Sequence, residues 1–133
     1  MGRLILADPS AWIEYLRGTG SETHLRLRDD LHAGERVATT DVVLLEVLGG
    51  ARDKGHHQEL QRLLYAREYL RTYGPSDFEA GARIYRICRK GGDTIRKLSD
   101  CVIAAVALRC GAAVLARDGD FTAIARHVEL ELA

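Results

Sequence analysis

The chain has 133 residues, enough for one domain with a single core, and its 47% of hydrophobic residues exclude an intrinsically disordered protein. No apolar stretch is as long as a membrane span, and the N-terminus lacks the basic and apolar regions of a signal peptide, so we expect a cytoplasmic protein. Acidic and basic residues number 19 each, but 16 of the basic residues are arginine, the side chain best shaped for phosphate. Zero net charge therefore does not argue against a nucleic-acid partner.

Short apolar runs alternate with amphipathic segments along the chain. Residues 4–7 suit a strand buried on both faces, after which Pro9 ends strand pairing and Ser10 can cap a helix. Further strands are predicted at 37–39, 69–73, 113–116 and, at a sheet edge, 128–132, and helices at 10–17, 21–33, 42–48, 54–66, 77–90, 101–110 and 122–126. This alternation predicts an α/β fold with a mostly parallel central sheet and helices on both faces, in one domain over residues 1–133.

Acidic residues recur where predicted strands end. Asp8 directly follows the first strand, and Asp118 and Asp120 follow the strand at 113–116. In open α/β sheets this carboxyl edge is where ligands bind. A simpler structural explanation also exists, because Asp8 can shape the turn before Pro9 and Asp-Gly-Asp serves a tight turn.

Two further acids lie on apolar helices. Glu46 interrupts the helix at 42–48, where a carboxylate is rarely left without a partner, although an exposed position beside an arginine would also account for it. Asp100 stands at the start of the most apolar segment of the chain, where either it or Ser99 could simply be the N-cap.

Five acids on elements that are expected to meet at one sheet edge indicate a metal site. Clustered carboxylates raise each other's pKa unless a cation neutralises them, and hard oxygen ligands select Mg²⁺ or Mn²⁺. Two such ions about 4 Å apart can activate a water and stabilise the leaving oxygen of a phosphodiester. This chemistry needs no serine or histidine nucleophile.

The same acids lie in four segments, which are, in order, Asp8-Pro9-Ser10-Ala11-Trp12, the lone Glu46, Ser99-Asp100-Cys101-Val102-Ile103-Ala104-Ala105 and Arg117-Asp118-Gly119-Asp120-Phe121. Over essentially the whole chain this order resembles the PIN-domain ribonucleases, most of all the VapC toxins of prokaryotic toxin–antitoxin pairs. Pro9 departs from the pattern, since the family more often has a small or β-branched residue there. Only the local turn should differ.

The resemblance implies a PIN-like three-layer sandwich and a Mg²⁺-dependent endoribonuclease, with Mn²⁺ as a substitute metal, that cleaves a structured RNA. The family's acids fall on Asp8, Glu46, Asp100 and Asp118, with Asp120 in the same turn. Asp8 and Asp100 are expected as direct metal ligands, while Glu46 and Asp118 complete the metal shell through water or orient the nucleophile, and Asp118 is also a candidate metal ligand. All five acids are candidate catalytic residues.

The resemblance also implies a homodimer, further assembled by a VapB-type antitoxin that lays apolar residues along a groove. Trp12, Tyr15 and Leu16 lie on the helix just after Asp8 and could line that groove. Alternatively, all three could belong to the ordinary core.

A basic stripe is the candidate substrate-binding surface. The span from Arg83 to Lys97 holds six basic residues against one acid, and two of the six directly precede the Leu-Ser-Asp segment. We expect Arg86 and Arg89, together with Ser10, to bind the substrate, with the arginines holding RNA phosphates. A solvated helix face is the simpler alternative.

Other classes of protein fit the sequence less well. A haloacid-dehalogenase-like, aspartate-based phosphatase needs a second aspartate two positions after Asp8, where Ser10 stands. A receiver domain needs a lysine after its last strand, and no lysine follows Lys97. A PIN-like RNA- or protein-binding module without catalysis remains as an alternative, and a metal-dependent cleavage assay separates it from the enzyme.

Overall fold

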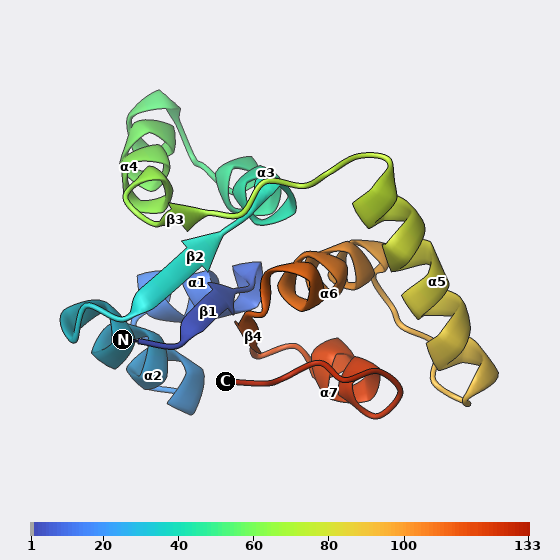
Figure 1. The fold of residues 1–133 in the computed structure, drawn as a ribbon. Helices are drawn as coiled ribbons and strands as arrows, with labels where there is room; N and C mark the ends of the chain where they lie inside the picture. Colours follow the sequence, from blue (N-terminus) through green and yellow to red (C-terminus); the bar gives the residue numbers. More distant parts are fainter. Residues whose placement is uncertain (1) are drawn as a thin grey trace.

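The computed structural model describes residues 2–133 (Figure 1). Its elements are, in chain order, β1 (Leu4–Ala7), α1 (Pro9–Arg17), α2 (Glu22–His32), β2 (Arg36–Thr39), α3 (Asp41–Gly49), α4 (Lys54–Tyr65), β3 (Glu68–Tyr69), α5 (Ser76–Lys90), α6 (Leu98–Cys110), β4 (Ala113–Leu115) and α7 (Gly119–Ala125). The alternation of strands and helices read from the sequence is confirmed. No helix in this described part of the chain is both long and apolar enough to cross a membrane.

The four strands form one sheet in the order β3-β2-β1-β4, and every pairing between them is parallel. β1 lies inside the sheet, with Ile5 opposite Val37 of β2 on one side and Ala113 of β4 on the other. Its apolar residues are buried because both faces of the sheet are covered by helices, in the three-layer α/β arrangement that was expected. The carboxyl ends of β1 and β4 therefore open at the same edge.

α6 is the helix buried most deeply. Residues 100–107 are all buried, because α6 packs on β4, carries α5 along its outer side and contacts α7 (Figure 1). Gly81 makes the close approach of α5 possible, since a Cβ at that position would lie 3.2 Å from the Val102 side chain. This packing places the N-terminus of α6 beside the N-terminus of α7.

Two predicted strands are shorter in the structure than expected. The third strand keeps only Glu68–Tyr69, because the chain then turns to place the N–H of Thr72 on the Asp41 carboxylate at the start of α3. The expected edge strand at 128–132 is reduced to a single parallel bridge between Val114 and Leu132. Local backbone hydrogen bonds keep residues 126–130 in turns, so the chain lies beside β4 only after them. The four-stranded sheet is therefore narrower than the sequence indicated.

Candidate metal centre

Asp8 is fixed at the junction of β1 and α1. Its backbone N–H continues the sheet by donating to Leu115 of β4 at 2.9 Å, and its carboxylate Oδ2 accepts from the Ser10 N–H at 2.9 Å. Asp8 is therefore the N-cap of α1, with Pro9 as the first helical residue. The prediction that Ser10 caps this helix was wrong, because a proline favours the first position inside a helix and moves the cap to the residue before it.

Ser10 instead holds Asp8 in place. Its hydroxyl donates to Oδ2 of Asp8 at 2.6 Å and accepts the backbone N–H of Arg117 at 2.9 Å, which ties the loop after β4 to the loop after β1. Both hydrogen-bonding directions of the hydroxyl are used within the protein. These contacts favour a positioning role for Ser10.

The second oxygen of Asp8 has no such support. Asp8 is 0% exposed, and its Oδ1 finds no donor anywhere in residues 2–133. Burial raises the pKa of Asp8 to about 6, against the opposing effects of the Ser10 hydrogen bonds and the Lys97 charge.

Asp100 lies in the first turn of α6 and is likewise 0% exposed. Neither of its carboxylate oxygens has a hydrogen-bond donor within the described part of the chain. Burial and then the nearby charge of Asp8 raise the pKa of Asp100 to about 9. The N-cap of α6 is Lys97, so the expectation that Ser99 or Asp100 caps this helix was wrong. Asp100 is therefore a buried ionisable group inside the first turn of the helix.

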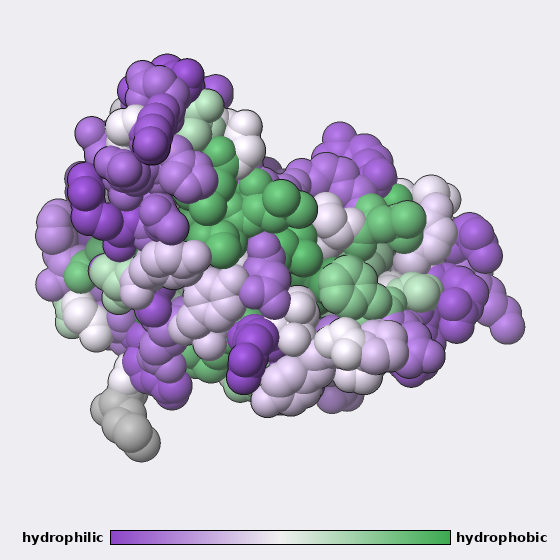
Figure 2. All heavy atoms as spheres, turned by 90° about the horizontal axis from the view of Figure 1, so that it is seen from above, coloured by the Kyte–Doolittle hydropathy of each residue, from purple (hydrophilic) through white to green (hydrophobic). Residues whose placement is uncertain are grey.

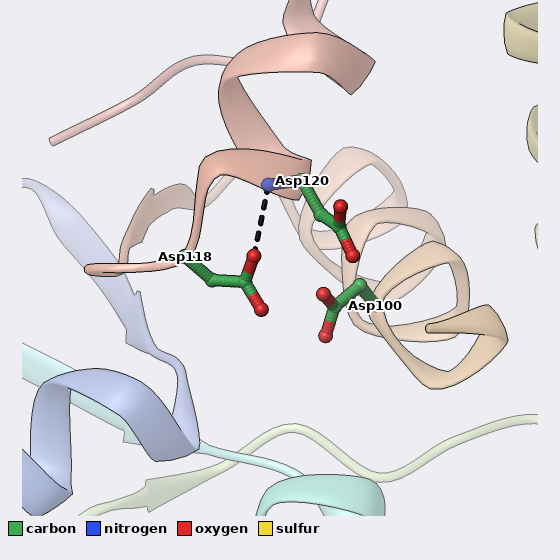
Figure 3. Close-up of side chains that lie close together, drawn as sticks. All are labelled: Asp100, Asp118 and Asp120. Atoms are coloured by element: carbon green, nitrogen blue, oxygen red, sulfur yellow. Dashed lines mark hydrogen bonds between the residues drawn. The ribbon is translucent and has the colours of Figure 1, made fainter. Parts of the chain in front are cut away.

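Asp118 and Asp120 come from the start of α7. Asp118 is the N-cap and accepts the Asp120 N–H at 2.9 Å, while Asp120 is buried beside it. One carboxylate oxygen from each of Asp100, Asp118 and Asp120 lies within 4.8 Å of the others (Figure 3). Burial raises the pKa of Asp118, but the Asp120 N–H, the Asp100 carboxyl and the charges of Lys97 and Arg96 outweigh it and hold that pKa below its usual value.

Asp120 differs from its neighbours because its oxygens are already bonded. The backbone N–H groups of Arg96 and Lys97 donate to Oδ1 and Oδ2 at 3.4 and 3.2 Å, and the Arg96 side chain adds a contact at 3.4 Å. Asp120 thus fixes the segment that leads into α6. Asp118-Gly119-Asp120 was predicted either to form a tight turn or to supply acids to the site. It does both, because the turn places the Asp120 carboxylate against the N–H groups of Arg96 and Lys97.

Glu46 approaches the cluster from α3. Its Oε1 lies 3.5 Å from Nζ of Lys97, and its Oε2 is buried without a donor among residues 2–133. The Lys97 charge also acts on Asp8 and Asp100, so this lysine links Glu46 to the other acids. Lys97 was predicted as part of the basic span that holds RNA, and not as part of the acid cluster. Its place three residues before Asp100 was a sequence signal for that cluster, but nothing local indicated its contact with Glu46.

The donor set fits a divalent cation. Four buried carboxylate oxygens from Asp8, Glu46 and Asp100 find no donor in the part of the chain that the structure describes. Such groups are costly to bury unless a cation or a proton compensates them. Oxygen ligands of this kind suit Mg²⁺ or Mn²⁺. Asp100, Asp118 and Asp120 lie close enough together to hold the ion. Asp8, whose charge acts on Asp100, lies beside them, and Glu46 lies at the margin.

A cavity of about 330 Å³ with a partly apolar lining adjoins this centre at Glu46. Its lining residues come from α1, α3 and α4 and the segment between the last two; they are Ile13, Leu16, Arg17, Glu46, Val47, Gly50, Arg52, His56 and Leu60. Figure 2 shows hydrophobic surface gathered over α3, where Leu45 is 72% exposed. Leu16 was predicted for such a groove and lines it. Trp12 does not, because it is 0% exposed and belongs to the core, and Tyr15 is half-buried against it.

The arginines of α5 are exposed on the outer helix of the molecule (Figure 1). Arg89 lies over the Tyr85 ring at 5.6 Å from its centroid, and Arg83 borders a second cavity between α5 and α6. Of the predicted basic span, only Arg96 and Lys97 are seen to contact the acids in residues 2–133. The predicted basic stripe is therefore divided in two: its first four residues lie on α5, whereas Arg96 and Lys97 lie at the acid cluster.

Comparison with known proteins shows the family to which this chain belongs. The family model described as the PIN domain matches residues 5–127, and the chain belongs to the PIN-domain family. Its relatives include the VapC ribonuclease Mb1587 of Mycobacterium bovis and the ribonuclease VapC11 of Mycobacterium tuberculosis. Each is 42% identical to this chain over 131 residues, which is 98% of both sequences. The crystal structure of VapBC2 from Rickettsia felis, bound to a DNA fragment from its promoter, has the same fold. The TM-score is 0.74 at 16% identity, over 98% of this chain and 97% of that chain.

Proposed function

We propose that this chain is a Mg²⁺-dependent endoribonuclease and the toxin of a VapBC-type toxin–antitoxin pair, which cleaves a structured RNA by means of a metal-activated water. One observation carries the proposal. Asp8 and Asp100 are completely buried and keep three carboxylate oxygens without a donor in the described residues, at the carboxyl edge of a parallel sheet. The names of the relatives, VapC ribonucleases, support the same activity.

A bound divalent ion supplies positive charge and lowers the pKa of a coordinated water, which is the chemistry that hydrolysis of a phosphodiester needs. The residues of this chain prepare the site for the ion. Asp8 and Asp100 present free oxygens to it, Ser10 fixes the Asp8 carboxylate, and the Asp120 N–H fixes that of Asp118. Mn²⁺ substitutes for Mg²⁺ because both are hard, six-coordinate cations.

Glu46 has a different role in this proposal. Its Oε1 is engaged by Lys97, whereas its buried Oε2 remains available as an acceptor. A water beside the ion can donate a hydrogen to Oε2, which orients it for attack on phosphorus. Asp120 positions the start of α6 through the Arg96 and Lys97 N–H groups rather than binding the ion.

The substrate is proposed to lie along α5 as well as in the centre. Arg86 and Arg89 are exposed and carry charge along the helix that packs outside α6. Such residues bind phosphates and so contribute affinity more than sequence choice.

The apolar cavity is the proposed seat of the antitoxin. Ile13, Leu16 and Val47 offer it an apolar floor, and Glu46 belongs both to this lining and to the acid cluster. An apolar segment of a VapB-type protein seated there would lie next to the centre. The homodimer expected from the resemblance stays a prediction, which light scattering of the purified protein checks.

The activity is tested on total RNA that contains tRNA and ribosomal RNA. The parent protein should cut specific bonds in the presence of Mg²⁺ or Mn²⁺ and none in EDTA. Asp8→Asn and Asp100→Asn should each remove cleavage, while Asp29→Asn, at an exposed position of α2, should not. Cleavage that persists in the Asp100→Asn protein would refute the proposed function.

A further inference from the structure

Lys97 joins the two halves of the acid cluster. Its backbone N–H donates to Oδ2 of Asp120 at 3.2 Å, and its Nζ lies 3.5 Å from Oε1 of Glu46. As the N-cap of α6, it precedes Asp100 by less than one helical turn, and the Asp100 N–H donates to its carbonyl at 3.0 Å. Contacts with α7 and α6 thus fix the Lys97 backbone, and the ammonium group of its half-exposed side chain reaches Glu46 on α3.

The free carboxylate oxygens divide into two groups around this lysine. Those of Asp8 and Asp100 have no donor in residues 2–133, while Glu46 has one oxygen facing Lys97 and one without a donor. Asp100 lies within 4.8 Å of Asp118 and Asp120, and the charge of Asp8 acts on it, so one divalent ion on this side can neutralise these acids. A second ion bound by Glu46 would lie against the ammonium group and be repelled by it. The arrangement favours one divalent ion and one ammonium group over two ions.

Arg96 is already committed elsewhere. Its guanidinium contacts Asp118 at 3.2 Å and Asp120 at 3.4 Å, and its side chain is 75% exposed, so it lies toward the α7 side of the cluster. Lys97 has a compact charge with three N–H donors, and its contact with Glu46 leaves donors to spare.

We propose that Lys97 is a catalytic residue, whose ammonium group contacts a non-bridging oxygen of the scissile phosphate on the Glu46 side of the centre. There it supplies the positive charge that a second divalent ion would otherwise supply. A fixed cation placed where negative charge accumulates lowers the barrier to phosphodiester hydrolysis. This inference rests on the proposed ribonuclease function and adds a residue to it.

The test compares Lys97→Met, which keeps the aliphatic stem and loses the charge, with Lys97→Arg, which keeps a charge. At saturating Mn²⁺, single-turnover cleavage of total RNA should fall about 100-fold in Lys97→Met and less in Lys97→Arg. Calorimetric titration without RNA should show one Mn²⁺ per parent chain, and several-fold tighter binding by Lys97→Met, because a repelling charge is gone. Lys54→Met, at the exposed first residue of α4, is the matched control and should change neither quantity.

Three results would overturn the role of Lys97. The first is cleavage by Lys97→Met at the parental rate at saturating Mn²⁺. The second is loss of Mn²⁺ binding by Lys97→Met, which would mean that the lysine only holds the acids together. The third is binding of two Mn²⁺ ions per parent chain. Lys97→Gln is measured in the same way if thermal melts show that Lys97→Met does not fold. Failure of the proposed function looks different, because Asp8→Asn and Asp100→Asn would then cleave RNA as the parent does.

Discussion

The hydroxyl of Ser10 lies 2.6 Å from Oδ2 of Asp8 and donates its hydrogen to it. The same oxygen of Ser10 accepts the N–H of Arg117. One side chain therefore both orients a buried acid and links the loop after β1 to the loop after β4. Loss of this hydroxyl should therefore affect the stability of the protein and the metal centre together.

Ser10→Ala is expected to lower the free energy of unfolding by about 1–2 kcal/mol, because a buried carboxylate and a backbone N–H each lose a partner. It should also weaken Mn²⁺ binding, since the Asp8 carboxylate loses its fixed orientation. Chemical denaturation and calorimetry measure the two effects. Ser76→Ala, which removes a hydroxyl bonded to the Tyr73 carbonyl at the start of α5, should cost stability and leave Mn²⁺ affinity unchanged. Equal Mn²⁺ affinity in both variants would contradict the assignment.

The metal-free protein should become less stable as pH rises from about 6 to 9. Burial raises the pKa of Asp100 to about 9 and that of Asp8 to about 6, above the values of about 4 in an unfolded chain. The folded state therefore binds more protons than the unfolded state between about pH 4 and 9, and the free energy of unfolding falls as pH rises through this range. Acids such as Asp93, whose pKa the hydrogen bonds from Arg126 and His127 lower, lose their stabilising effect only in more acidic solution.

Thermal melts in EDTA at several pH values measure this trend. Asp100→Asn should flatten the decline and raise the melting temperature at pH 8, because no charge is then buried at that position. Mn²⁺ should bind the parent more tightly as pH rises, since the ion displaces protons from the same oxygens. A melting temperature that rises steadily from pH 6 to 9 in the metal-free parent would contradict the raised pKa values of Asp8 and Asp100.

Asp120→Asn separates a positioning acid from a metal ligand. The carboxylate of Asp120 accepts the N–H groups of Arg96 and Lys97, and an amide in its place leaves one of them without an acceptor. We expect a loss of about 1–3 kcal/mol in the free energy of unfolding, with a smaller fall in Mn²⁺ affinity than Asp100→Asn causes. Equal loss of Mn²⁺ binding in the two variants would make Asp120 a direct ligand.

The α5 arginines are tested by salt dependence. In an Asp100→Asn background that cannot cut, Arg86→Ala with Arg89→Ala should weaken RNA binding and reduce the slope of log affinity against log salt by about 2. Mn²⁺ affinity should not change. The matched double variant, Arg28→Ala with Arg62→Ala on the exposed faces of α2 and α4, should keep the parental slope. If both double variants behave alike, α5 carries only a solvated basic face.

The antitoxin groove is tested with the protein encoded by the small open reading frame expected directly upstream. Ile13→Ala with Leu16→Ala removes apolar surface from the cavity and should weaken binding by about 2 kcal/mol, which is roughly 30-fold. Leu25→Ala, also a partly exposed leucine but on α2 and outside the cavity, should bind like the parent. Unchanged affinity in the Ile13 and Leu16 variant would move the antitoxin to another surface.

Much of the fold followed from local patterns in the sequence. The apolar runs gave β1, β2 and β4, and the acids that follow β1 and β4 lie at one edge because parallel strands bring their carboxyl ends together. The α1 cap was predicted wrongly at Ser10, although Pro9, which favours the first helical position, is a local signal for a cap at Asp8. The start of α6 could not be predicted from the sequence, because Lys97 caps that helix without a side-chain hydrogen bond and only tertiary packing defines its first turn.

Contacts between residues far apart in the chain could not be predicted from local sequence patterns. The approach of Lys97 to Glu46 joins α6 to α3, and nothing in either segment alone announces it. The error at Trp12 has a related cause. An apolar residue on an amphipathic helix can face the sheet or solvent, and the tertiary structure turns Trp12 inward while Ile13 and Leu16, 41% and 45% exposed, face the cavity.

The pairing of β1 with β4 has a consequence for a chain that is still being synthesised. Arg117, which anchors the loop after β1, follows Ser10 by 107 positions and so leaves the ribosome long after it. A nascent polypeptide has neither the contact between Ser10 and Arg117 nor Asp118 until β4 and the loop after it have been translated, and a product terminated before β4 never acquires them. The acid cluster therefore cannot assemble at the ribosome before β4 is made, and it forms only once β4 and α7 have folded against β1.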